Sequence, residues 1–174
     1  GPSRQLPQAG TGGRIEREDW IYRCTLQVDA AILQQEFFEL VADGLDTLAT
    51  LRLNGVAIGA SENMFRRYRF SVRSALREGA NELQIEFHNT LDYIAHREAW
   101  QPFLERNDPV GGRSRIRKAQ YQYSWDWGPR FVTCGIWQAI RIEAWSGCRI
   151  ESVQVKQDHR PDAQVDVQLV PELI

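Results

Sequence analysis

Alternation of apolar and polar residues with a period of two runs through most of the chain between residues 20 and 145. Residues 20–28 place Trp20, Tyr22, Cys24, Leu26 and Val28 on one side of an extended segment. A period of two puts successive side chains on opposite faces of a strand. This segment is therefore predicted to be a half-buried strand. Similar strands are expected within the segments 36–44, 49–58, 68–72, 79–88 and 135–145.

The dipeptide Asn54-Gly55 interrupts one alternating run between Leu53 and Val56. Asn and Gly tolerate the positive φ angles of a type I′ turn, so the sequence predicts a β-hairpin here. Many short strands separated by turn signals favour an all-β, antiparallel β-sandwich. We therefore expect one sandwich domain over residues 15–147.

Both ends of the chain differ from this middle part. Residues 1–14 are polar and rich in Gly and Pro, which is typical of a disordered tail or an expression remnant. Residues 148–174 contain two further strand patterns around the polar segment 159–162. Two strands make no stable sheet alone. Residues 148–174 are thus expected to begin a second, incomplete β-domain, or to add strands to the first.

Composition excludes several classes of function. The formal net charge is −2, whereas nucleic-acid binding favours a basic surface. The basic run 113–118 is typical of a solvated loop edge. No segment has the length and apolarity of a membrane span, and no signal peptide is visible. The three cysteines have no close-spaced pair, so we expect free thiols rather than disulfides or a zinc site.

The region between residues 88 and 135 lacks strand alternation. Residues 90–104 could form a short helix with Leu91, Ile94 and Ala95 on one side. The rest is predicted to be loop, and a loop this long in a compact domain is often functional. Its many Trp and Tyr residues argue against disorder.

The segment QYQYSWDWGPRF (120–131) ends this loop and places Trp125 and Trp127 on either side of Asp126. Indole rings cover the apolar faces of a sugar, and a carboxylate accepts hydrogen bonds from neighbouring hydroxyls. An extended segment, however, would point Asp126 away from both rings. The alternative is that one Trp belongs to the core while Asp126 pairs with Arg130 or Arg117. The residues alone leave both interpretations open.

No catalytic group or metal site emerges from the rest of the sequence. The three histidines lie far apart, without a Ser or Cys that would suggest a triad. No two carboxylates suggest the acid–nucleophile pair of a glycosidase. Asp43 and Asp46 flank Gly44, and we interpret them as turn residues. No phosphate-binding loop or cofactor motif is evident.

Several segments together resemble the N-terminal sugar-binding domain of glycoside hydrolase family 2. The shared segments are DWIYRCTLQV, LVADGLDTLATLRLNGVAIGASENMFRRYRFSV, GANELQIEFHN and IRKAQYQYSWDWGPRFVTCGIWQAIRIEAW. NMFRRYRF and IRKAQYQYSWDWGP are similar to the β-mannosidase branch in particular. The resemblance covers about residues 15–147.

This resemblance implies a jelly-roll, galactose-binding-like sandwich, followed by an immunoglobulin-like domain that residues 148–174 would begin. A catalytic barrel with two glutamates would follow, removing terminal β-linked mannose with retention and without a cofactor. Trp125 and Asp126 match positions that reach the mannose. Trp127, Gly128 and Pro129 would shape their loop. Arg117 and Lys118 match a basic pair to which we assign no role.

The sequence departs from the family because it contains neither the barrel nor the first strands of the sandwich. We therefore expect an inactive fragment that forms one wall of a mannose pocket, with a β-mannoside or other carbohydrate and the remaining enzyme domains as partners. The alternatives are a free-standing carbohydrate-binding module, a purely structural domain, or a β-galactosidase or β-glucuronidase parent. The compartment stays open among cytoplasm, periplasm and lysosome.

Overall fold

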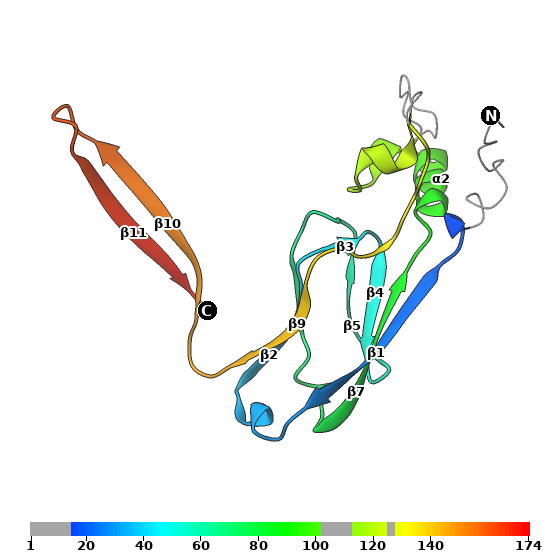
Figure 1. Cartoon of the computed structure of the whole chain (residues 1–174), viewed down its shortest axis with the longest axis horizontal. Helices are drawn as coiled ribbons and strands as arrows, with labels where there is room; N and C mark the ends of the chain where they lie inside the picture. The colour runs from blue at the N-terminus through cyan, green and yellow to red at the C-terminus, as the bar shows by residue number, and fades with distance from the viewer. Residues whose placement is uncertain (1–14, 102–112, 125–127) are drawn as a thin grey trace, which may run out of the picture.

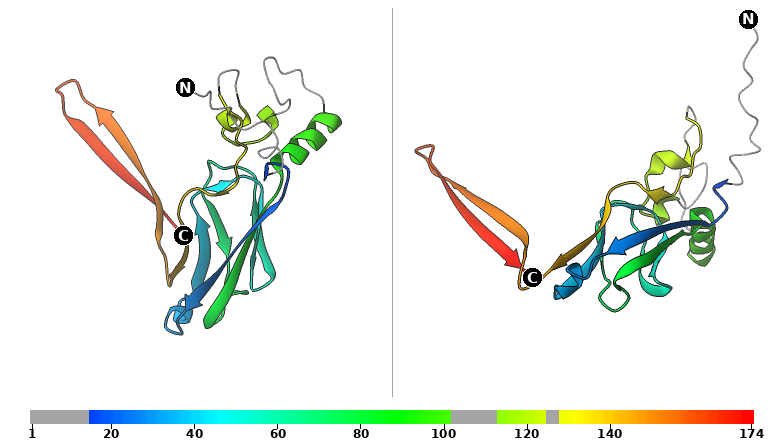
Figure 2. Two further views of the ribbon diagram at one scale, coloured as in Figure 1. Left: turned by 45° about the vertical axis from the view of Figure 1, so that its right-hand side comes forward. Right: turned by 60° about the horizontal axis from the view of Figure 1, so that its bottom comes forward.

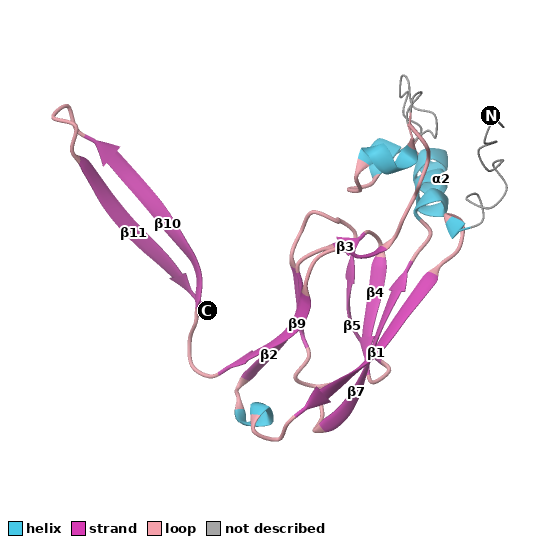
Figure 3. Ribbon diagram, in the orientation of Figure 1, coloured by secondary structure: helices cyan, strands magenta, loops and turns pink. Residues whose placement is uncertain are grey.

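The computed structural model describes residues 15–101, 113–124 and 128–174. Most of the regular structure in these residues is β-strand, and the paired strands run antiparallel (Figures 1 and 3). Two sheets face each other across an apolar core. The prediction of an all-β, antiparallel sandwich is confirmed. The segment expected to be a tail, residues 1–14, lies outside the described residues.

The first sheet has four strands, in the order β1 (Trp20–Val28), β7 (Gly79–Phe87), β4 (Ala49–Leu53) and β5 (Val56–Ser61). The turn between β4 and β5 has φ values of 51° at Asn54 and 81° at Gly55. Both values lie in the left-handed region that a type I′ turn requires. The predicted hairpin is therefore confirmed.

The second sheet has the order β6 (Tyr68–Ser71), β2 (Phe37–Ala42) and β9 (Ile140–Trp145). A short pair, β3 (Leu45–Asp46) with β8 (Gly135–Ile136), continues beside it. The prediction of one strand over 135–145 is wrong, because residues 137–139 leave the ladder. The indole of Trp137 donates a hydrogen bond of 2.9 Å to the carbonyl of Met64, which ties this residue to another segment.

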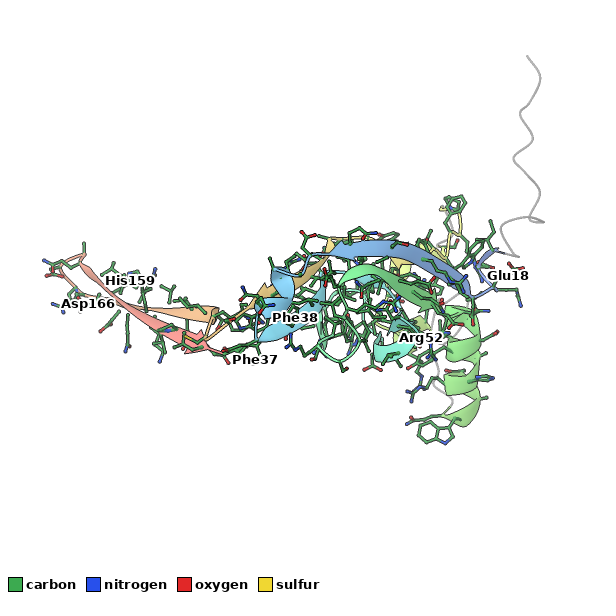
Figure 4. All side chains as sticks on the ribbon, turned by 90° about the horizontal axis from the view of Figure 1, so that it is seen from below. Glu18, Phe37, Phe38, Arg52, His159 and Asp166 are labelled. Atoms are coloured by element: carbon green, nitrogen blue, oxygen red, sulfur yellow. The ribbon has the colours of Figure 1, made fainter. Side chains whose placement is uncertain are left out.

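The core lies between the sheets and is built from the inward positions of five strands. Its members include Phe38, Leu40, Leu51, Leu53, Phe70, Leu83, Ile85 and Phe87. Phe38 lies inside the sandwich (Figure 4). Burying these side chains is the main source of stability in a domain of this size.

Strand β1 departs from the expected half-buried strand. Trp20 and Tyr22 are 40% and 43% exposed, and among its nine residues only Val28 is buried. The reason is topological: β1 and β9 are each at the edge of their sheet, and no described strand lies between them. A groove of about 700 Å³ separates Leu26 and Val28 of β1 from Ile142 and Ala144 of β9.

The last two strands, β10 (Ile150–His159) and β11 (Val165–Leu173), form a hairpin that projects from the sandwich (Figures 1 and 2). His159 and Asp166 lie at its far end (Figure 4). Every residue of the hairpin strands except Glu151 is exposed. That these strands begin a second domain stays a prediction.

Ion pairs connect the base of this hairpin to the outer face of the second sheet. The guanidinium of Arg149 lies 3.0 Å from a carboxylate oxygen of Glu39 and 3.2 Å from one of Glu143. It also lies 3.9 Å from the ring centre of Trp145. Arg69 of β6 reaches Glu151 of β10 at 3.4 Å. The described contacts at this junction are thus largely charged.

Candidate functional site

The helix α2 (Thr90–Trp100) and the residues 113–124 and 128–134 lie at one end of the sandwich (Figure 2). The side chain of Asn89 begins the helix by accepting hydrogen bonds from the amides of Leu91, at 2.9 Å, and Asp92, at 3.3 Å. The predicted helix is confirmed for residues 90–100. Ile94 is buried as expected, but Ala95 is exposed, so that part of the predicted helix face was wrong.

A second, smaller apolar cluster holds the residues on both sides of 125–127 against the sandwich. It joins residues from the end of the sheets, from the helix and from both of these sides: Leu48, Ile94, Ile116, Tyr123 and Val132. Residues 113–124 contain two short 3₁₀ helices, η2 (Arg113–Arg115) and η3 (Gln120–Tyr123). The fully buried Tyr123 places its hydroxyl 3.2 Å from the hydroxyl oxygen of Thr90. The chain is therefore packed into the fold on both sides of residues 125–127.

Three of the predicted site residues, Trp125, Asp126 and Trp127, lie outside the described residues. The residues on either side are joined, because the hydroxyl of Ser124 donates a hydrogen bond of 2.8 Å to the carbonyl of Gly128. Pro129 follows as an exposed residue. Arg130, considered as a partner for Asp126, forms an ion pair of 2.9 Å with Glu16.

The residues before this loop include a buried lysine that pairs with an aspartate of the sandwich. Lys118, with a fully buried side chain, contacts Asp46 of β3, whose side chain is 5% exposed. Lys118 also donates a hydrogen bond of 2.6 Å to the carbonyl of Thr133. Burial lowers the pKa of Lys118, while the carboxylate of Asp46 opposes this shift.

The interpretation of Asp46 as a turn residue is wrong, because it lies in β3, whereas Asp43 lies in the bend between β2 and β3 as expected. Asp43 forms ion pairs of 2.6 Å with both Arg67 and Arg141, and the hydrogen bond from Arg141 is the main cause that lowers its pKa. Asp46 points into the protein, where burial would penalise an unpaired charge. Sequence reasoning missed this pairing because Lys118 is 72 positions away in the chain. The signals at Lys118 were its place in a basic run and its match to a basic pair of the family, and neither pointed to Asp46.

A cleft of about 610 Å³ opens between the four-stranded sheet and α2. Its walls combine carboxylates, two histidines, an arginine and two tyrosines: Asp19, Glu62, Arg66, Tyr68, His88, Asp92, Tyr93 and His96. The segment next to Arg66 is tied to the loop, since the amide of Met64 donates a hydrogen bond of 2.9 Å to the carbonyl of Arg117. Cleft and loop thus share one end of the fold.

Within the described residues, Asp19, Glu86 and His88 are close enough to be considered as metal ligands. His88 places Nδ1 at 3.5 Å from Asp19 and Nε2 at 2.8 Å from the hydroxyl of Thr50. Both ring nitrogens already face partners, and about half of the Asp19 side chain is open to solvent. The geometry is explained by hydrogen bonding between strand ends, and we assign no metal to it. The three cysteines are free thiols, as expected.

None of the helices in the described residues is long and apolar enough to cross a membrane. The described residues include surface carboxylates in ion pairs, such as Glu143 beside Arg69 and Arg141. No acid–nucleophile pair of the glycosidase type was predicted, and we assign no catalytic residue to this chain.

Comparison with known proteins identifies the family of this chain. Residues 11–138 match the model of the glycosyl hydrolase 2 galactose-binding domain-like family. The chain is 35% identical over 161 residues to β-mannosidase B of Aspergillus clavatus, which covers 87% of the chain and 18% of that protein. It is 32% identical over 142 residues to the β-mannosidase of Mus musculus, covering 76% of the chain and 16% of that protein.

A solved structure gives the same result. The crystal structure of the β-D-mannosidase from Dictyoglomus thermophilum matches 90% of the chain with a TM-score of 0.83 and 35% identity. The match covers 19% of that protein, so the chain spans less than a fifth of the length of these relatives. The resemblance inferred from the sequence motifs is thereby confirmed. With most of its length matched by the family model, the chain belongs to the glycosyl hydrolase 2 galactose-binding domain-like family.

Proposed function

We propose that this chain is the N-terminal, sugar-binding domain of a β-mannosidase-like exo-glycosidase and forms one wall of its mannose pocket. The observation that carries the proposal is the match to β-mannosidases at 32–37% identity over most of the chain. The intact enzyme would hydrolyse terminal β-mannosyl residues. The catalytic carboxylates would come from parts of the protein beyond this chain, because we assign none here.

In this proposal Asp126 holds substrate and does no proton transfer. Its carboxylate would accept hydrogen bonds from hydroxyls of the terminal mannose, while the indole of Trp125 would cover an apolar face of the ring. Trp127, Gly128 and Pro129 would shape the loop. The hydrogen bond between Ser124 and Gly128 supports this role, because it holds the two ends of the loop together.

The test is the kinetics of Asp126→Ala in the full-length protein, with a chromogenic β-mannoside as substrate. A hydrogen bond to a charged group is worth about 1.5–3 kcal/mol. The variant should therefore lose about 10- to 100-fold in kcat/KM. Asp29→Ala is a matched control, because Asp29 is an exposed aspartate that follows β1. Unchanged kinetics for Asp126→Ala would exclude the assignment. If the wild-type protein turns over a β-galactoside or β-glucuronide faster than the β-mannoside, the parent enzyme is a different one.

A free-standing carbohydrate-binding module is the second candidate, because residues on both sides of 125–127 are held by contacts within this chain. Calorimetric titration of the isolated chain with mannose and β-mannobiose separates the two. Saturable binding that Asp126→Ala abolishes would support the module. Absence of binding would favour a pocket completed by other domains, or a purely structural domain if the kinetics of the full-length variant are also unchanged.

A further inference from the structure

The buried pair of Lys118 and Asp46 carries a desolvation penalty that lowers the stability of the sandwich. Removing two charges from water costs several kcal/mol per ion, and a well-packed apolar pair is often as stable or more stable. The pair joins β3, through Asp46, to residues 113–124, through Lys118. Its bonding partners indicate what it does there.

Two side chains extend the pair toward the loop. The amide nitrogen of Gln122 donates a hydrogen bond of 3.1 Å to Asp46 Oδ2. The amide oxygen of Gln122 accepts hydrogen bonds from the backbone nitrogen of Thr133, at 3.2 Å, and from its hydroxyl, at 3.0 Å. Lys118 reaches the carbonyl of the same Thr133. The backbone adds a hydrogen bond of 3.1 Å from the amide of Phe131 to the carbonyl of Gln122.

These contacts bind both ends of the loop to one buried carboxylate. Lys118 and Gln122 precede residues 125–127, and Thr133 follows them, while Asp46 belongs to the rigid sandwich. Hydrogen bonds to a fixed buried charge are directional and stronger than those between neutral groups. An apolar pair would fill the same space, but it would not fix the position of Gln122 and Thr133 relative to β3.

We propose that Asp46 and Lys118 are positioning residues that fix residues 120–124 and 128–133, which flank the proposed substrate-binding residues, relative to the sandwich. The effect on mannose binding rests on the proposed function. The anchoring of Gln122 and Thr133 by the buried pair does not depend on it. Neither residue touches substrate; both act through Gln122 and Thr133. Misplacement of a substrate-binding group by about 1 Å can cost about 10²-fold in rate. The pair is therefore expected to matter for catalysis from a position inside the sandwich.

The first experiment measures amide hydrogen exchange in the chain. The paired variant Asp46→Leu with Lys118→Met removes both charges together, so no buried ion is left alone. We expect the amides of Phe131 and Thr133 to exchange at least tenfold faster relative to those of the β4–β7 ladder. The milder variant Gln122→Met keeps the ion pair and should move the same two amides in the same direction.

The matched control is Asn81→Ala. Asn81 is a fully buried polar residue in the turn region of β7, at the opposite end of the four-stranded sheet from α2. Its loss should lower stability without a selective effect on Phe131 and Thr133. If the paired variant and Gln122→Met leave those two amides as protected as in the wild type, the positioning role is refuted.

The second experiment is kinetic and uses the full-length protein. The paired variant should lose about 10²-fold in kcat/KM for a β-mannoside, whereas Asn81→Ala should stay within threefold of the wild type. If Asp126→Ala reduces kcat/KM but the paired variant does not, the positioning proposal fails and the proposed function survives. If Asp126→Ala has no effect, the proposed function fails, and faster exchange at Phe131 and Thr133 still supports the structural part.

Discussion

The substitution Gly59→Ala tests how tightly the two sheets are packed. A Cβ atom on Gly59 of β5 would lie 2.2 Å from one ring carbon of Phe70 and 2.3 Å from another. Ordinary contacts between carbon atoms are about 3.5–4.0 Å, so the ring would have to move by more than 1 Å. Phe70 is 9% exposed and lies in the main core, which leaves it little room.

Overpacking of this kind costs about 1–3 kcal/mol. In a chain of this length, that corresponds to a fall in Tm of about 2–4 °C for each kcal/mol. The assay is urea denaturation followed by tryptophan fluorescence, with the same m-value required in all variants. Ala57→Val is the control, because it adds volume at an exposed position of the same strand.

The decisive variant combines Gly59→Ala with Phe70→Leu, which removes ring atoms near the new methyl group. Because the clash is then relieved, the double variant should be more stable than the sum of the two single effects predicts, by at least about 0.5 kcal/mol. If the two effects add within error, the contact between β5 and β6 inferred from the structure is wrong.

Three further outcomes follow from other contacts. Asn89→Ala removes the helix N-cap of α2 and should cost about 0.5–2 kcal/mol in the free energy of unfolding. Asn81→Ala removes the hydrogen bonds that the Asn81 side chain donates to the carbonyls of Arg77, at 2.7 Å, and Gly79, at 3.0 Å, and should cost about 1–3 kcal/mol in the same urea assay. Burial raises the pKa of Glu143, but hydrogen bonds from arginines outweigh this and hold it below its ordinary value. Its contribution to stability is thus present above pH about 4.3 and is lost as pH falls through the folded pKa. Glu143→Gln should therefore flatten the decline of the urea midpoint between about pH 5 and 3, and an unchanged decline would contradict this.

The period-two pattern was sufficient to predict the sandwich, because alternation along a strand reports directly on its two faces. Asn54-Gly55 located one hairpin for an equally local reason. The exposure of β1 could not be read from Trp20 or Tyr22, since burial depends on which strand lies opposite. That is a property of topology rather than of the strand itself.

At the candidate site, too, local features could be predicted from the sequence, whereas contacts between distant residues could not. The loop could be predicted because residues 88–135 lack strand alternation, and the family because several segments together resemble it, whereas residues 120–131 alone left sugar binding and core packing both open. The anchoring of that loop could not be predicted. Asp46 looks like a turn residue beside Gly44, and Lys118 looks like part of a solvated basic run. Their pairing is visible only in the folded structure, because the two residues are 72 positions apart in the sequence.

The charged junction at Arg149 has a consequence for the shape of the molecule in solution. An apolar seam keeps its geometry when salt is added, but ion pairs near the surface are screened, since the Debye length falls from about 10 Å at 0.1 M salt to about 3 Å at 1 M. We therefore expect the orientation of the projecting hairpin to depend on ionic strength. The radius of gyration from small-angle scattering should change with salt in the wild type and much less in a variant without Arg149. Ionic strength would then change the angle between the sandwich and the hairpin β10–β11.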